Sequence, residues 1–163
     1  MSNFDKQFSW QAGYIDEVVR LIAPYIITLS RPEVDKNENG DLEIVFPRNG
    51  TVGVRLRKEG AAKFAGQVTF RSRSMYGGKT EITKIIEGYG DYFFYGHVSP
   101  TGVIWHWYLL NLNEVRAAFT RRSSMLRRPQ IPNGDDTYFI PFDVQQDFPK
   151  AIIAHYDDRK AAA

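Results

Sequence analysis

The sequence predicts a mixed α/β fold, a sheet flanked by helices, in a single domain over residues 1–163. Three observations predict it. An apolar stripe near the N-terminus follows helical spacing, several later segments have the pattern of strands, and helical and strand-like segments alternate along the chain. With 163 residues, of which 43% are hydrophobic, the chain is long enough for one domain. We expect its core over residues 7–147 and a frayed C-terminus over 157–163.

The first element is predicted as a helix over residues 7–29. Its apolar side chains recur three and four residues apart, which places them on one buried stripe. The stripe consists of Tyr14, Val18, Leu21, Ile22, Tyr25 and Leu29. Pro24 lacks a backbone donor and is expected to kink or end this helix.

Three strands are predicted next, over residues 41–46, 51–57 and 67–73. Asn49-Gly50 between the first two is a typical hairpin turn, so these two strands are expected to pair. Alternation along a strand places Arg55 and Arg57 on one face of the second strand, and Arg71 and Arg73 on one face of the third. If these strands pair, the four arginines form one positive face, suited to phosphate contacts.

A short helix is predicted over residues 81–87, with Thr80 as its cap and Glu81 and Lys84 on one side. Two apolar strands follow over 92–98 and 103–112, then a helix from residue 113 and a strand over 137–142.

A turn over Ser99 to Gly102 would place Tyr95 opposite His106. His97 would then lie one diagonal step from His106 on the same face. A metal pair and a pair of core histidines are both compatible with this arrangement, and the sequence favours core histidines because it offers no further ligands nearby.

Composition excludes several kinds of chemistry. The chain has no cysteine, which excludes disulfides, cysteine-bound zinc, iron–sulfur clusters and thiol nucleophiles. It has no apolar run long enough to span a bilayer, and its N-terminus lacks the pattern of a signal peptide. These features predict a protein in the cytoplasm, with no membrane partner.

Charge is distributed unevenly along the chain, although the net charge is only +2. Residues 1–50 hold eight acids and five bases, whereas residues 51–80 hold seven bases and one acid. Residues 115–134 contain five arginines, including Arg121 and Arg122, and no acid. A basic middle between acidic ends indicates a surface that binds a polyanion, with solvated arginines as the alternative.

The order of elements and four stretches resemble the PD-(D/E)XK nuclease superfamily, and more narrowly a group of phage and prophage-type proteins assigned to it. The stretches are Asp35…Gly40-Asp41-Leu42, Val52 to Arg57, Gly78 to Ile85 and Gly88 to Phe93. The resemblance implies a restriction-endonuclease-like α-β-β-β-α-β core. It also implies magnesium held by carboxylates, with Glu17 matching the acid of the first helix and Asp41 the acid of a strand.

The (D/E)-x-K tripeptide of that superfamily falls here on Gly53-Val54-Arg55, which has no carboxylate and an arginine in place of lysine. Arginine binds phosphate but does not act as a base. Glu81 and Lys84 are the candidates to supply the missing acid and base. Glu17, Asp41 and Glu81 would then hold Mg²⁺ for phosphodiester hydrolysis, with Lys84 or Arg55 on the phosphate.

Three functions stay open on the sequence. The first is a magnesium-dependent nuclease, with DNA as the favoured substrate and RNA still open. The phage resemblance implies that it acts in a bacterial host cell. The second is a nucleic-acid-binding module without catalysis, which uses Arg55, Arg57, Arg71, Arg73, Arg121 and Arg122. The third is a phage-encoded protein that binds a host protein through exposed aromatic side chains of residues 89–108. A homodimer is compatible with each.

Overall fold

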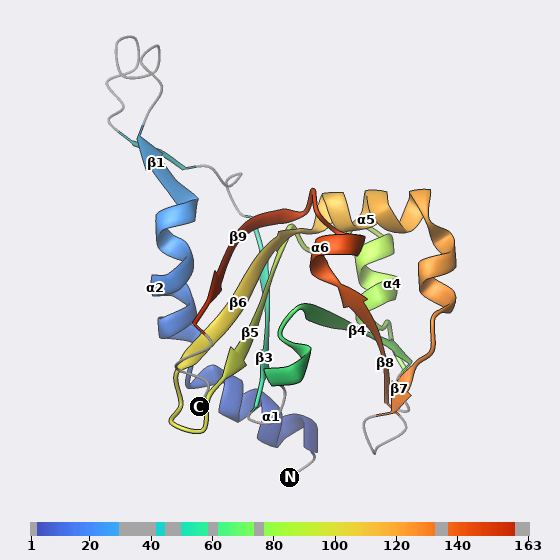
Figure 1. Cartoon of the computed structure of the whole chain (residues 1–163), viewed down its shortest axis with the longest axis horizontal. Coiled ribbons are helices and arrows are strands. Elements are labelled where there is room, and N and C mark those ends of the chain that lie inside the picture. Colours follow the sequence, from blue (N-terminus) through green and yellow to red (C-terminus); the bar gives the residue numbers. More distant parts are fainter. Residues whose placement is uncertain are drawn as a thin grey trace. The chain divides into compact units, whose positions relative to one another are not determined.

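The computed structural model describes residues 3–29, 42–44, 50–58, 62–73, 77–132 and 137–158. The chain divides into two compact units, residues 1–50 and 51–163. The single domain stays a prediction. The mixed α/β class is confirmed, because both units combine helices with strands (Figure 1).

The first unit contains two helices and a two-stranded antiparallel sheet. Helix α1 spans Asn3–Ala12, and α2 spans Ile15–Ile26 with Asp16 and Glu17 in its first turn. Acidic side chains there interact favourably with the positive end of the helix dipole. Strands β1 (Ile27–Leu29) and β2 (Leu42–Ile44) pair with each other.

The prediction of one helix over residues 7–29 is wrong in two respects. The helix is interrupted at Gly13 and Tyr14, and the chain becomes a strand from Ile27. Glycine lowers helix stability, which accounts for the position of the break. Pro24 lies inside α2, in its last turn. Val18 and Ile22 are buried as predicted, but Tyr25 of the same stripe is exposed.

The second unit contains a four-stranded sheet in the order β3-β5-β6-β9. Its strands span Val52–Arg57, Tyr92–Val98, Ile104–Asn111 and Ile152–Asp157. Strand β3 runs parallel to β5, and the other pairs are antiparallel, so the sheet is mixed.

A second, antiparallel sheet of this unit has the order β4-β8-β7, with strands Gln67–Arg73, Tyr138–Asp143 and Ile131–Pro132. The helices described in the second unit are α4 (Glu81–Ile86), α5 (Leu112–Arg121) and α6 (Val144–Asp147), with 3₁₀ turns η1 (Ala62–Phe64) and η2 (Ser123–Arg127). Figure 1 shows α5 across one end of these strands, close to α4 and α6.

The predicted pairing of strands is wrong in two places. The second strand does not form a hairpin with the first, because β2 pairs with β1 and β3 pairs with β5. The arginine-bearing strands β3 and β4 lie in different sheets. Parallel pairing needs a long crossover, and residues 58–91 between β3 and β5 are enough for one.

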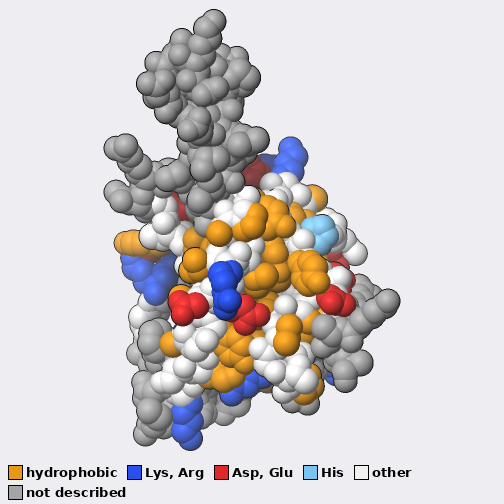
Figure 2. Space-filling model, turned by 90° about the vertical axis from the view of Figure 1, so that its left-hand side faces the viewer, with side chains coloured by type: hydrophobic (Ala, Val, Ile, Leu, Met, Phe, Trp, Pro, Cys, Tyr) orange, Lys and Arg blue, Asp and Glu red, His pale blue; other side chains and the backbone are white. Residues whose placement is uncertain are grey.

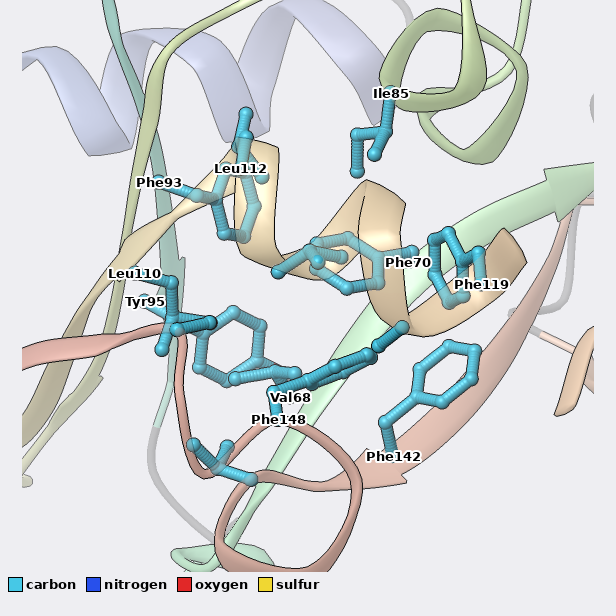
Figure 3. Packing of buried hydrophobic residues seen from close by; sticks show 14 of the residues in the cluster. Val68, Phe70, Ile85, Phe93, Tyr95, Leu110, Leu112, Phe119, Phe142 and Phe148 are labelled. Atoms are coloured by element: carbon cyan, nitrogen blue, oxygen red, sulfur yellow. The ribbon is translucent and has the colours of Figure 1, made fainter. Parts of the chain in front are cut away.

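One apolar cluster joins both sheets to helices α4 and α5. Phe70 of β4 lies at its centre, with ring centroids 5.3 Å from Phe93, 5.8 Å from Phe142 and 6.2 Å from Phe148. Figure 3 shows these rings meeting from β4, β5, β8 and the turn after α6. The sheets are therefore held together by side chains from elements far apart in sequence.

Capping residues determine where helices α4 and α5, which pack on this core, begin. Thr80 accepts a hydrogen bond from the Thr83 backbone N–H, which confirms the predicted cap of α4. Asn111 accepts from the Asn113 N–H at 2.9 Å and begins α5 directly after β6. These caps fix where Glu81 and the residues of α5 lie.

Gly96 of β5 is required for close packing inside the four-stranded sheet. A Cβ atom there would lie 2.9 Å from Leu56 Cδ2 and 3.0 Å from Phe94 Cε1. We expect Gly96→Ala to lower the free energy of unfolding by about 2 kcal/mol, because buried neighbours must move. Urea denaturation measures this loss of stability. Gly66→Ala is the control, because a Cβ atom there meets no atom within 4 Å. Equal stability of the two variants would contradict this packing.

The aromatic stretch considered for partner binding is mostly buried. Phe93, Phe94, Trp105, Trp107 and Tyr108 are all less than 9% exposed. These rings therefore belong to the core and do not form the exposed surface that the partner-binding hypothesis needs. Among the aromatic residues of 89–108, Tyr89 alone is more than half exposed.

Hydrophobic side chains do reach the surface elsewhere, as one face of the molecule in Figure 2 shows. Those with exposed side chains include Ile15 and Val19 on α2 and Ile153 and Tyr156 on β9. In the described part of the chain, no helix is both long and apolar enough to cross a bilayer.

Candidate functional site

Two arginines of β3 project from the same face of the four-stranded sheet. Arg55 is paired in register with Tyr95 of β5, and Arg57 with His97. Because side chains alternate along a strand, Arg55, Arg57, Tyr95 and His97 share this face. The same face carries Phe93 and Tyr95 into the core, so the arginines lie beside the junction with the second sheet.

Glu81, the first residue of α4, connects three elements. One carboxylate oxygen accepts a hydrogen bond from the Arg55 guanidinium and forms an ion pair with it. The other oxygen accepts from the Arg71 backbone N–H of β4 at 2.9 Å. Both oxygens are thus engaged by β3 and β4, and Glu81 joins the two sheets through α4.

Arg57 takes part in a second polar network. Its Nε donates to the Tyr95 hydroxyl at 2.7 Å, and its terminal nitrogen donates to Thr69 Oγ1 at 3.1 Å. The Thr69 and Tyr95 hydroxyls are themselves 3.1 Å apart. This triangle again joins β3 and β5 of one sheet to β4 of the other.

The guanidinium groups also lie over aromatic rings of β8. Arg55 lies 4.8 Å and Arg71 5.9 Å from the centroid of Phe139, and Arg73 lies 5.4 Å from that of Tyr138. Such cation–π contacts hold a guanidinium in place. The N–H donors, which point outward in the plane of the guanidinium group itself, stay available for hydrogen bonds. Among the described residues, the buried Nε of Arg71 has no hydrogen-bond acceptor.

Arg55, Arg57 and Arg71 come together although strands β3 and β4 do not pair. The prediction that Arg71 and Arg73 share one face of β4 is wrong, because a bulge between them pairs Arg71 with Phe139 and Arg73 with Tyr138, which point to opposite faces of β8. Burial lowers the pKa of the Arg55 guanidinium, Glu81 and Tyr95 raise it, and the nearby charges of Arg71 and Arg57 lower it again. Arginine keeps its positive charge at neutral pH. Arg57 and Arg71 therefore place their charges close to Arg55, which is itself paired with Glu81, and we name these three arginines, with the exposed Arg73 at the end of β4, the arginine cluster.

A row of polar residues crosses the sheet beside this cluster. Arg57, His97, His106 and Asp157 are consecutive partners across β3, β5, β6 and β9. The predicted diagonal relation of the histidines is wrong, because a bulge near Val98 puts His97 directly opposite His106. Their ring centroids are 5.6 Å apart, and His106 Nδ1 lies 3.6 Å from an Asp157 carboxylate oxygen.

His97 is 2% exposed, and within the described structure neither ring nitrogen has a hydrogen-bond partner. Burial, His106 and Arg57 lower its pKa to about 4. The ring is therefore neutral at pH 7, as expected for a core histidine.

Of the other predicted catalytic residues, the described structure places Lys84 alone in the same unit as the arginine cluster. Glu17 lies on α2 in the first unit. Asp35 and Asp41 lie outside the described residues. Lys84 is exposed on α4, and no ion pair with Glu81 is among its described contacts. The described residues contain no group of three histidine or acidic side chains arranged to hold a metal ion.

Arg121 and Arg122 lie apart from the cluster, at the end of α5. They line a pocket with Asp147, whose carboxylate is buried and accepts two hydrogen bonds from Arg128. Arg122 donates to the Asp147 backbone carbonyl.

Sequence reasoning did not identify Thr69, Phe139 or Asp147. The alternation of β4 places Thr69 on the face of Arg71, which is the one local signal that could have found it. The arginines that contact Phe139 and Asp147 are distant from them in the chain.

Comparison with protein-family models, with curated proteins and with solved structures finds no match to this chain.

Proposed function

We propose that this protein binds nucleic acid through the arginine cluster, without using Glu81 as a catalytic metal ligand. The scaffold is proposed to be of the PD-(D/E)XK type. The observation that carries the proposal is that the charges of Arg57 and Arg71 lie close to Arg55, whose one carboxylate partner is Glu81, next to aromatic rings of β8.

The charges of the cluster support a polyanionic ligand. Glu81 balances one of the three nearest guanidinium groups, and the excess positive charge attracts phosphate. Arg73 is exposed and forms no ion pair among the described residues, so its guanidinium is open to a phosphate oxygen. Tyr138 and Phe139 add rings that support stacking or hold the arginines in position.

The engagement of Glu81 argues for binding rather than hydrolysis. A metal-binding carboxylate needs free lone pairs, and it usually shares the metal with other carboxylates. Here both oxygens of Glu81 accept hydrogen bonds from arginine residues. A magnesium-dependent nuclease that uses Glu17, Asp41 and Lys84 remains a prediction, which the same experiment tests.

The test is fluorescence anisotropy with labelled single-stranded DNA, duplex DNA and RNA of one sequence, between 50 and 200 mM salt as roughly the range where phosphate contacts respond most. We expect salt-dependent binding, with DNA preferred. Arg73→Gln should weaken it about tenfold, the value of one charge-assisted contact. The salt slope should also fall by about one.

Arg127→Gln is the matched control, since Arg127 is exposed and lies on η2 outside the cluster. Equal losses in the two variants would show nonspecific attraction and contradict the assignment. Adding Mg²⁺ or Mn²⁺ to the same samples tests cleavage. Cutting by the wild type that Glu81→Gln abolishes, at unchanged stability, would overturn the non-catalytic part of the proposal.

A further inference from the structure

The pocket at α5 has one wall made by a single face of that helix. Glu114, Ala118, Arg121 and Arg122 recur at the spacing that brings helix residues to one side. The opposite wall is the segment Gln146–Ala151. The pocket volume of about 350 Å³ lies within the range of small-molecule sites.

Two hydrogen bonds show the relative chain direction of the two pocket walls. Arg122 at the C-terminal end of α5 donates to the Asp147 carbonyl, while the Asn111 N–H at the other end donates to the Ala151 carbonyl at 2.8 Å. The two walls therefore run in opposite directions. Arg121 and Arg122 lie at the end near Asp147, and Glu114 lies toward the end near Ala151.

The end near Asp147 is positive. The Asp147 carboxylate accepts from both terminal nitrogens of Arg128 and from the Asp143 N–H, so its charge is matched by Arg128. Arg122 contacts it only at 4.0 Å. Arg121 is exposed, and the described structure gives it no ion pair. The Arg121 guanidinium is thus available to an anion at this end, and Arg122 can add the N–H donors that do not bind the Asp147 carbonyl.

The opposite end carries an acceptor. Glu114 lines the pocket, and its carboxylate has no ion pair among the described residues. The lining also contains four apolar residues, Ala118, Phe148, Pro149 and Ala151, of which Pro149 is exposed and the others are buried, together with the polar Gln146 and Lys150. Glu114 and Arg121 are seven residues apart, about 10 Å along the helix.

We propose that this pocket binds a guanosine 5′-monophosphate group. The phosphate lies on Arg121 and Arg122, since paired guanidinium groups match its oxygens. The base lies over the apolar lining. Its neighbouring N1–H and N2–H donors face the Glu114 carboxylate, a pairing that adenine cannot make with two donors. The group comes either from a free nucleotide or from the 5′ end of a strand.

Isothermal titration with the full chain tests the proposal, using GMP, AMP, guanosine and inorganic phosphate. We expect GMP to bind at least about tenfold more tightly than AMP or guanosine, because each lacks one charge-assisted contact. Glu114→Gln should remove the preference for GMP over AMP. Arg121→Gln should weaken both nucleotides to a similar extent, and Arg127→Gln should leave them unchanged.

Two oligonucleotides that begin with guanosine, one with and one without a 5′-phosphate, distinguish the sources. Tighter binding of the phosphorylated strand, lost in Arg121→Gln, assigns the pocket to strand ends, whereas binding of GMP alone assigns it to free nucleotide. The proposal is overturned if neither GMP nor the 5′-phosphorylated strand binds, or if GMP and AMP bind equally. The inference is independent of the arginine cluster, because Arg73→Gln should retain GMP binding even if strand binding fails.

Discussion

Replacement of Glu81 by glutamine is expected to lower the free energy of unfolding by about 3 kcal/mol, or roughly 6–12 °C in Tm. The Arg55 side chain is 11% exposed and would keep its charge after losing the carboxylate that balances it. An unpaired buried charge is strongly destabilising. Because the Glu81 side chain is 25% exposed, we expect the lower end of the range for buried pairs.

The sign of this effect separates two interpretations of Glu81. A carboxylate kept for a metal ion lies near other carboxylates, so its neutralisation relieves repulsion and raises stability in metal-free buffer. A carboxylate that joins two sheets through Arg55 and Arg71 does the opposite. Denaturation by urea in the presence of EDTA, with wild type and Glu81→Gln side by side, therefore decides between them.

A double-mutant cycle with Arg55→Met tests whether the pair itself is responsible. If Arg55 and Glu81 are coupled as the ion pair indicates, the double variant should lose less stability than the sum of the single variants, by at least about 1 kcal/mol. Thr83→Ala, a substitution elsewhere on α4, controls for a general weakening of that helix. Strict additivity of Arg55→Met and Glu81→Gln would contradict the coupling.

Local signals were sufficient to predict most individual elements. Strand β4 over Gln67–Arg73 and strand β5 over Tyr92–Val98 have the predicted bounds, and α4 begins after Thr80 as expected. Strand β9 (Ile152–Asp157) was missed, since no element was predicted between the strand over residues 137–142 and the frayed C-terminus over 157–163. This strand is the edge of its sheet, with several exposed side chains, so it lacks a marked apolar pattern.

The pairing of elements could not be read from the sequence in the same way. Asn49-Gly50 is a strong local turn signal, yet β3 pairs with β5, forty residues further along. Pairing depends on which apolar faces meet in the core, and Phe70 and Phe93 have no local signature of their contact. For the same reason, the sequence named Arg55 and Glu81 but could not show that they bind each other.

Acidification should destabilise the protein through His97. In an unfolded chain this histidine has an ordinary pKa near 6.5, whereas in the folded protein its pKa is about 4. Between these values the unfolded chain binds a proton that the folded protein does not bind. The contribution of His97 to stability is therefore complete above pH 6.5 and is lost as the pH falls toward 4.

The expected loss follows from this difference in pKa. One proton over the interval lowers the free energy of unfolding by about 1.4 kcal/mol per pH unit, or about 3 kcal/mol in total. The surroundings of His97 in its sheet account for its lowered pKa. The ring is buried, and it lies opposite His106 and beside the positive charge of Arg57.

Urea denaturation at several pH values between 7.5 and 4.5 measures this slope, and His97→Phe identifies its source. Phenylalanine keeps a ring among Tyr95, Trp105 and His106 but binds no proton. We expect the variant to lose less stability on acidification than the wild type does. His155→Gln, which removes an exposed histidine of β9, should keep the wild-type slope. If His97→Phe keeps it too, the acid sensitivity must arise from another group, and the neutral buried state of His97 is refuted.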